Sequence, residues 1–310
     1  MTDAPAARLT IDGGQSGMRL RVRGEDGRAV TTETGPVRTD RPVVPQVAAA
    51  AAEVAARTPF GELAVGMTGL TAQATRPQEL LDLVAPLGVR RVALAHDSVT
   101  GYLGANGLEP GAVCAAGTGV VTLGVGPART ARVDGWGYLF GDAGSAFWIG
   151  RAGFEAALRA FDGRGARTAL LDAVEARFGD PAELYMTVQA DVDRVRLTAS
   201  FARDVAAAAD AGDGAALRIE RDAAQELARS VAAALERSGS RRGEPARVSR
   251  IGRVLEANAR IRAAWAQRVV DLVPDAVVEA PAGDPLDGAE RLLDVPLVHP
   301  LAASIATAAR

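Results

Sequence analysis

Two glycine-rich turns, each directly after a short apolar run, occupy matching places in the two halves of this chain. LTID (9–12) leads into GGQSG (13–17), and AVCAAGTG (112–119) ends in a glycine turn of its own. After each turn come two further strand-like runs and then a helix-forming segment. The repeated order predicts a duplicated α/β architecture, because each half builds the same sheet before its first helix.

Three polar interruptions separate apolar runs between residues 92 and 150. They are HDS (96–98), AGTGV (116–120) and DGWGYLFGDAGS (134–145). The apolar runs have the length and residue types of buried strands. Because ligands of open α/β sheets bind at the carboxyl ends of strands, we expect the chemistry of the protein at these interruptions.

The composition is that of a soluble protein large enough for two domains, with 310 residues, 48% of them hydrophobic, and a net charge of −3. No apolar stretch approaches about 18 residues and the N-terminus lacks a signal pattern, so we expect a cytoplasmic protein without a membrane partner. The mild negative charge argues against nucleic acid as a partner. The single cysteine, Cys114, excludes an internal disulfide and a structural zinc cage.

All 35 basic residues are arginine, and the chain contains no lysine. This excludes a Walker-A lysine, the strand lysine of protein kinases and a Schiff-base lysine. Any phosphate chemistry must therefore use backbone amides, hydroxyls, carboxylates and a metal ion.

The segment GLEPG (107–111) predicts a boundary between an N-terminal domain, residues 1–110, and a C-terminal domain, residues 111–284. We expect a C-terminal helix, about 285–310, to complete the first domain. A further helix is expected from Leu255 to Val270.

The turn after the first strand carries Asp12, Gly13, Gly14, Gln15 and Ser16. Glycines let the backbone approach phosphate oxygens, and consecutive amides can hold an anion. Asp12 could orient a hydrated Mg²⁺, which takes one or two carboxylates plus phosphate. An ordinary hairpin turn explains these residues equally well.

Gly117, Thr118 and Gly119 occupy the equivalent place in the second half. Two such turns suggest paired phosphate clamps, although this is not a P-loop because no lysine follows and no helix opens there. Gly252, after a late strand, could let an adenine ring lie against the backbone, but a strand-to-helix turn often needs a glycine as well.

Two carboxylates follow buried strands of the central stretch. Asp97 is well placed as a general base that takes a proton from an attacking hydroxyl, or it caps the helix beginning at Ser98. Asp142 could bind sugar hydroxyls or be a cap. Trp136 and Trp148 are interpreted as core residues.

The chain resembles the N-acetylglucosamine kinase branch of the BadF/BadG-type ATPase family, within the actin, hexokinase and sugar-kinase superfamily. The residues that carry the resemblance are DGGQSG (12–17), HDS (96–98), AAGTGV (115–120), GWGYLFGDAGSAFWIG (135–150), IGRV (251–254) and DPLDGA (284–289). The resemblance implies an α/β fold of two ribonuclease-H-like, actin-like ATPase domains, with ATP and Mg²⁺ in an interdomain cleft. It also implies a homodimer formed through the second domain.

The resemblance implies a role for each matching residue. The segment from Asp12 to Ser16 would form the first phosphate loop, with Asp12 toward the metal, and the segment from Gly117 to Gly119 the second. Asp97 would deprotonate the sugar. Gly252 would contact the adenosine. The sugar would be bound by Thr68, Asp97, Thr118 and Asp142.

Several positions depart from the family pattern. Gln15-Ser16 replaces a frequent Gly-Thr, Val120 a frequent Ser, and Ala143 a frequent Glu. Arg38 falls where N-acetylglucosamine kinases carry an Asn that touches the sugar, so glucosamine stays open beside N-acetylglucosamine.

Three functions are open at this point. The first is an ATP-dependent amino-sugar kinase, with the 6-hydroxyl as the expected acceptor. The second, an ATPase that activates a dehydratase or reductase through an iron–sulfur cluster, needs two cysteines per subunit, and this chain has one. The third is a catalytically weak, sugar-binding regulator.

Overall fold

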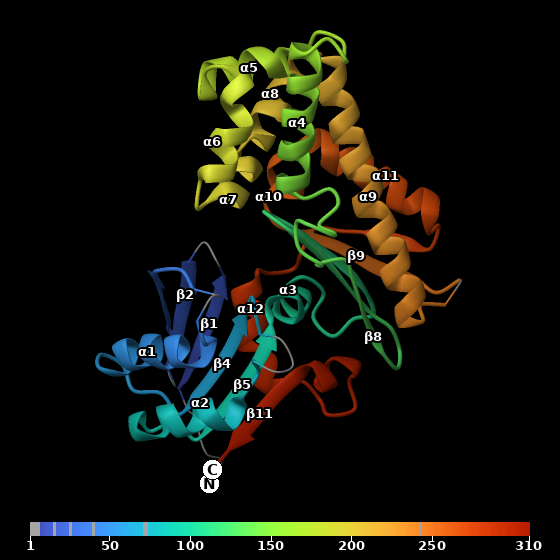
Figure 1. Ribbon diagram of the computed structural model, residues 1–310. Helices are drawn as coiled ribbons and strands as arrows, with labels where there is room; N and C mark the ends of the chain where they lie inside the picture. Colours follow the sequence, from blue (N-terminus) through green and yellow to red (C-terminus); the bar gives the residue numbers. More distant parts are fainter. Residues whose placement is uncertain (1–6, 15–16, 25–26, 39–40, 71–73, 242) are drawn as a thin grey trace. The chain divides into compact units, whose positions relative to one another are not determined.

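The computed structural model describes residues 7–14, 17–24, 27–38, 41–70, 74–241 and 243–310. The chain forms two compact units (Figure 1). Unit 1 comprises Met1–Pro110, Val125–Thr130 and Ala280–Arg310, and unit 2 comprises Gly111–Gly124 and Ala131–Glu279. Each unit has its own sheet and helices, which confirms the predicted α/β class. The interdomain cleft expected from the sequence stays a prediction.

Unit 1 is built on a six-stranded sheet in the order β11-β5-β4-β1-β2-β3. Its strands are β1 (Arg8–Gly14), β2 (Gly17–Arg23), β3 (Ala29–Thr34), β4 (Glu62–Met67), β5 (Arg91–His96) and β11 (Ile305–Ala309). β1, β4 and β5 are parallel, with Gly13 opposite Met67 and Met67 opposite His96. This register brings the carboxyl ends of the three strands to one edge of the sheet.

Unit 2 has a five-stranded sheet in the order β10-β9-β6-β7-β8. Its strands are β6 (Gly111–Ala116), β7 (Val120–Val125), β8 (Thr130–Val133), β9 (Ala246–Ile251) and β10 (Ala276–Val278). The order β8-β7-β6-β9-β10 repeats the order β3-β2-β1-β4-β5 of unit 1. The predicted duplication of the sheet is therefore confirmed.

The helices are unequally divided between the units. Unit 1 contains α1 (Val43–Ala55), α2 (Pro77–Val84), α3 (Asp97–Asn106) and α12 (Pro285–Glu290). Unit 2 contains α4 (Ala146–Phe161), α5 (Ala169–Phe178), α6 (Leu184–Ala190), α7 (Arg194–Ser200), α8 (Ala202–Asp210), α9 (Gly214–Ser238), α10 (Arg253–Ala257) and α11 (Ala259–Leu272). Each unit has a separate apolar core, centred on residues such as Ile11 in unit 1 and Trp265 in unit 2.

Two predicted helices are wrong in extent. The helix expected over 285–310 ends at Glu290, and Ile305–Ala309 form β11, which pairs antiparallel with β5. Pro296 and Pro300 cannot continue a helix, and the last residues pair with the free edge of β5 instead. The helix expected from Leu255 is divided at Asn258, whose Oδ1 accepts a hydrogen bond from the Ile261 N–H at 2.9 Å and caps α11.

The two helices α3 and α12 cross so closely that glycine is required on both. A Cβ atom on Gly288 would lie 1.8 Å from the carbonyl oxygen of Thr100. A Cβ atom on Gly104 would lie 2.0 Å from the carbonyl oxygen of Asp284. α12 is therefore fixed directly against the helix that begins at Asp97, although the two are far apart in the sequence.

This crossing can be tested with Gly288→Ala. The added methyl group would force backbone atoms of α3 to move, so we expect the free energy of unfolding to fall by about 3 kcal/mol. Gly35→Ala is the control, because no heavy atom lies within 4 Å of a Cβ at that position. Urea denaturation measures both variants, and a Gly288→Ala midpoint equal to that of Gly35→Ala would contradict the close crossing.

Candidate functional site

The predicted site residues of unit 1 converge on the edge where β1, β4 and β5 end. Asp12 and Gly13 lie near the carboxyl end of β1. Thr68 directly follows β4, and Asp97 directly follows β5. The Thr68 N–H donates to the Gly13 carbonyl at 3.1 Å, which joins the two strand ends. Gly14 is the last residue of β1.

Two further residues of the predicted first phosphate loop, Gln15 and Ser16, lie outside the described residues.

Asp97 is the first residue of α3, and it is not the cap. The cap is His96, whose Nδ1 accepts a hydrogen bond from the Ser98 N–H at 3.2 Å and lies 2.9 Å from Ser98 Oγ. Asp97 Oδ1 lies 2.8 Å from the same nitrogen. A protonated imidazole would donate from this nitrogen to the Asp97 carboxylate, whereas a ring that accepts the Ser98 N–H there would not. Oδ1 is buried against this ring, whereas the Asp97 side chain as a whole is 37% exposed.

Asp12 is held by an arginine of the next strand. Arg19 Nη2 donates to Asp12 Oδ2 at 2.9 Å, and Arg19 Nη1 donates to Asp284 Oδ2 at 2.7 Å. Burial raises the pKa of Asp12, the ion pair with Arg19 opposes this, and the negative charges of Asp97 and Asp284 add to the rise. Arg19 therefore pairs with two carboxylates at this edge, and Asp97 is a third carboxylate whose charge acts on Asp12.

These carboxylates do not make a ready metal cage. Within residues 7–14, 17–24, 27–38, 41–70, 74–241 and 243–310, no three His, Cys, Asp or Glu side chains are arranged to hold an ion together. Asp12 offers one carboxylate, of which Oδ2 already accepts from Arg19. This donor set suits Mg²⁺, which commonly takes one or two carboxylates and completes its shell with phosphate and water.

The second glycine turn connects β6 to β7 in unit 2. The Gly117 N–H donates to the Gly119 carbonyl at 2.9 Å, and the Thr118 side chain is exposed. Ala146 and Phe147, the first residues of α4, donate their N–H groups to the Gly117 and Thr118 carbonyls at 2.9 and 3.2 Å. The turn is thus fixed to the start of α4.

Gly252 lies beside this turn, at the end of β9. It has φ +92, and a Cβ there would lie 2.5 Å from the Ala116 carbonyl oxygen. The strand-to-helix turn and the neighbouring strand therefore explain this glycine without a ligand.

Asp142 belongs to the same arrangement and is only 8% exposed. It is not a cap, because the cap of α4 is Ser145, whose Oγ accepts from the Trp148 N–H. Burial raises the pKa of Asp142, while hydrogen bonds from the backbone N–H groups of Val120 and Gly137 lower it. The carboxylate thus ties the loop before α4 to the start of β7.

A second aspartate, Asp134, holds this loop from its other end. Oδ1 accepts from the Gly135 and Asp142 N–H groups, both at 2.8 Å, and Oδ2 accepts from the Ala143 N–H at 3.1 Å. Asp134 and Asp142 are the non-glycine residues with positive φ in the described chain, each at 59°. Two interlocked aspartates in left-handed conformation therefore fix the loop between β8 and α4.

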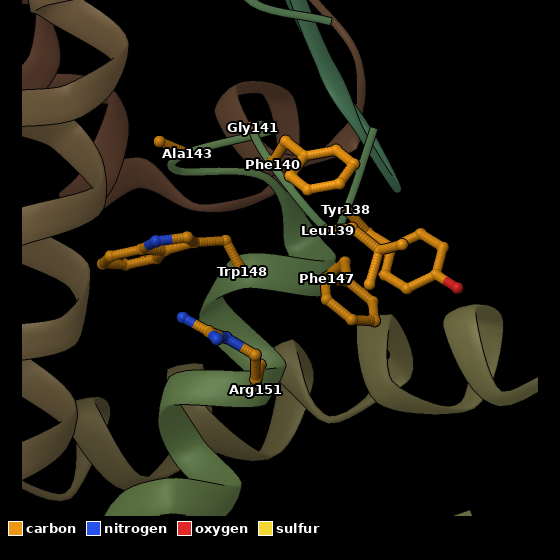
Figure 2. Close-up of a pocket in the computed structure, with 8 residues that line it drawn as sticks. All are labelled: Tyr138, Leu139, Phe140, Gly141, Ala143, Phe147, Trp148 and Arg151. Carbon is orange, nitrogen blue, oxygen red and sulfur yellow. The ribbon is translucent and has the colours of Figure 1, made fainter. Parts of the chain in front are cut away.

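The loop presents apolar side chains to solvent, contrary to the prediction that Trp136 is a core residue. Trp136 is 67% and Phe140 is 87% exposed. Figure 2 shows the pocket beside this loop, with Phe147 and Trp148 leaving α4 on opposite sides. Tyr138 packs on Phe147, with ring centroids 5.0 Å apart. Trp148, also interpreted as a core residue, is partly buried and packs against the core of unit 2 while lining this pocket.

Three residues of these sites, Arg19, Asp134 and Asp284, had no predicted role. The arginines of β2 alternate with buried apolar residues, a pattern that also describes a solvent-facing strand. Arg38, at the position where the sugar-binding Asn was expected, is exposed, and its backbone pairs with the Gln46 side chain at 2.9 Å.

Comparison with known proteins gives a family match over nearly the whole chain. Residues 9–286 match the BadF/BadG/BcrA/BcrD ATPase family. The N-acetylmuramic acid/N-acetylglucosamine kinase of Clostridium acetobutylicum is 32% identical over 175 residues, which is 54% of this chain. The matched part covers 56% of that kinase, so the chain spans about half the length of this curated relative.

Solved structures share the fold. One, solved as a candidate N-acetylglucosamine kinase from Chromobacterium violaceum, has a TM-score of 0.71 and 23% identity, covering 92% of this chain and 98% of that one. Another is a ROK family glucokinase from Streptomyces griseus in complex with glucose and AMPPNP, with a TM-score of 0.55 and 18% identity, covering 92% and 98%. At these identities the likeness concerns the fold.

The role of Asp134 can be tested by Asp134→Ala. The substitution removes the acceptor of three backbone N–H groups and puts alanine at positive φ, so we expect about 2 kcal/mol of destabilisation. Amide hydrogen exchange of residues 135–143 should accelerate. Asp134→Asn, which tolerates positive φ and keeps one acceptor oxygen, should lose less. Unchanged exchange in the alanine variant would show that the carboxylate does not hold the loop.

Proposed function

The chain belongs to the BadF/BadG/BcrA/BcrD ATPase family, and on that basis we propose that it is an ATP-dependent sugar kinase. Its substrate would be an amino sugar, N-acetylglucosamine or glucosamine, and the acceptor the 6-hydroxyl. In the proposed reaction the hydroxyl proton goes to Asp97. The hydroxyl oxygen bonds to the γ-phosphorus, the bond from that phosphorus to the bridging oxygen breaks, and ADP leaves.

The observation that carries the proposal is the position and exposure of the Asp97 carboxylate. Its side chain is 37% exposed and lies at the carboxyl end of β5 beside the β1 and β4 ends, with Oδ1 buried against the His96 ring. A solvent-exposed carboxylate is what a substrate hydroxyl needs in order to donate its proton. The Ser98 N–H and hydroxyl are engaged with His96 and do not occupy the Asp97 carboxylate.

The phosphate-binding part of the proposal uses both glycine turns. In unit 1 the residues Asp12 to Ser16 would contact phosphates, and in unit 2 the segment from Gly117 to Gly119 would do so, with Gly252 toward the adenosine. Asp12 would hold Mg²⁺, which when bound with the nucleotide neutralises phosphate charge. Because the chain has no lysine, arginine and backbone amides must supply the remaining positive potential.

The sugar-binding part is assigned by position. Thr68, Asp97, Thr118 and Asp142 are proposed to contact the sugar. Since the backbone of Val120 and Gly137 already binds the Asp142 carboxylate, we expect Asp142 to contribute through its remaining acceptor capacity or by fixing the loop. The relative from Clostridium acetobutylicum adds N-acetylmuramic acid to the sugars to be tested.

A homodimer and a cytoplasmic location belong to the proposal as well. No helix of the described residues is both long and apolar enough to cross a bilayer. The alternative of a cluster-bearing ATPase activator is disfavoured by the one cysteine, because Cys114 is fully buried in β6 and burial raises the pKa of its thiol to about 12.

The proposed activity is tested by measuring ADP release with ATP and Mg²⁺ across a panel of sugars. The panel contains N-acetylglucosamine, glucosamine, N-acetylmuramic acid, N-acetylmannosamine, glucose and a sample without sugar. We expect turnover that depends on one or two amino sugars, with the product identified by mass spectrometry. Equal ADP release without sugar would instead favour an ATPase, and no release with any sugar would favour a binding protein.

The base is tested by Asp97→Asn, which keeps the shape of the side chain and removes its basicity. We expect phosphorylation to fall by at least about 10³-fold, within the range typical of general-base removal. ATP binding, measured by calorimetry, should be retained. Asp180→Asn is the control, because that carboxylate caps a short exposed turn in unit 2. Wild-type turnover in Asp97→Asn would rule out the assigned role.

A further inference from the structure

Three arginines of β2 point to the same side of the unit 1 sheet. Arg19, Arg21 and Arg23 alternate with buried apolar residues, and each pairs with an acidic residue at or in α12. Arg21 Nη1 donates to Asp287 Oδ1 at 2.6 Å and to Glu290 Oε2 at 3.2 Å. Arg23 pairs with Glu290. These pairs hold α12, a helix from the end of the chain, on the first hairpin.

Arg19 differs from the other two because only one of its bonds goes to the α12 region. Its second bond goes to Asp12, which the proposed function places at the metal and the phosphates. The two nitrogens of one planar guanidinium group are thereby fixed on two carboxylates, a geometry that arginine supports and lysine does not. The Arg19 side chain is partly buried, with 34% of it exposed.

The second partner, Asp284, is itself held rigidly. Its Oδ1 accepts from the Asp287 N–H at 2.9 Å, and Asp287 Oδ2 accepts from the Asp284 N–H at 2.8 Å, which forms a capping box on α12. The Asp284 carbonyl lies against Gly104 of α3. α3 begins at Asp97. A chain of direct contacts therefore runs from Asp12 through Arg19 and Asp284 to the helix of the proposed base.

We propose that Arg19 is a positioning residue of the kinase, which fixes the Asp12 carboxylate relative to Asp97 by bridging it to Asp284 at the α3–α12 crossing. This inference rests on the proposed function. Arg19 acts through Asp12 and is not assigned a contact with the substrate. The neighbouring Arg21 binds the same helix, α12, without contacting Asp12. A variant of Arg21 therefore shows the effect of weakening the attachment of α12 alone.

The test compares Arg19→Gln with Arg21→Gln. We expect Arg19→Gln to lower kcat by about 10²-fold, as for a small misplacement of a reacting group, while KM for the sugar changes less than about twofold. The Mg²⁺ concentration for half-maximal rate should rise about tenfold, as is typical when the partner of a metal ligand is removed. Arg21→Gln should lose similar stability in urea but keep kcat within about twofold.

A binding measurement completes the design independently of turnover. Calorimetry gives the ATP dissociation constant with and without Mg²⁺, and we expect the Mg²⁺-dependent gain in affinity to shrink about tenfold in Arg19→Gln only. Arg19→Lys, which keeps the charge but has one nitrogen, should fall between wild type and Arg19→Gln, and it replaces Arg19→Gln if that variant does not fold. The matching Arg21→Lys is then the control.

The outcomes separate the two proposals. A wild-type protein without sugar-dependent turnover overturns the kinase assignment, and the ATP measurements then still decide whether Arg19 positions Asp12. Turnover with equal kcat, Mg²⁺ dependence and ATP affinity in Arg19→Gln and Arg21→Gln overturns the positioning role. That result would leave Arg19 as one of three docking arginines.

Discussion

The close crossing of α3 and α12 is the contact on which the arrangement of the unit 1 site depends. Gly104 and Gly288 let the two helices approach until backbone faces backbone. α3 also lies close to β4, where a Cβ on Gly66 would be 2.4 Å from the Thr100 side chain. Because Asp97 begins α3 and Asp284 begins the turn into α12, small residues along this crossing determine where both carboxylates stand.

In unit 2 the candidate site residues are also fixed in place, but by hydrogen bonds between aspartate side chains and the backbone. Its glycine turn is held by backbone hydrogen bonds to Asp142 and to the start of α4, and Asp134 in turn holds the backbone of Asp142. The guanidinium group of Arg132 also donates to this loop, at the Gly135 carbonyl, at 2.6 Å. The apolar side chains of Trp136 and Phe140 can face solvent because the loop is fixed by its backbone and does not depend on burying them.

Local sequence was enough to predict most of the strands and the duplicated order. The runs that form β1, β4, β5 and β6 are apolar and contain at their end, or meet within two residues of it, a glycine or an acidic residue, so their ends could be identified one by one. β11 could not be predicted, because SIATAA carries little strand signal and becomes a strand by pairing with β5. The prediction for Trp136 was wrong because burial was inferred from the apolar type of the side chain alone. The loop is held by two aspartates in left-handed conformation and does not require Trp136 to be buried.

Site residues could be predicted only where the local sequence around them determines their place in the fold. Asp97 follows a buried strand, so its place at the sheet edge could be inferred, whereas the partner of Arg19 lies 265 residues further on. An alternating arginine strand has the same pattern whether it faces water or a docked helix, and only tertiary structure distinguishes the two. The chain has no lysine, and Arg19 is the cation that binds Asp12. The same guanidinium group also binds Asp284, at the start of the helix that contacts α3. The strand that forms the first hairpin and the segment that closes the domain are therefore parts of one site, which explains why α12 must be built with an acidic residue before its first turn and glycine within it.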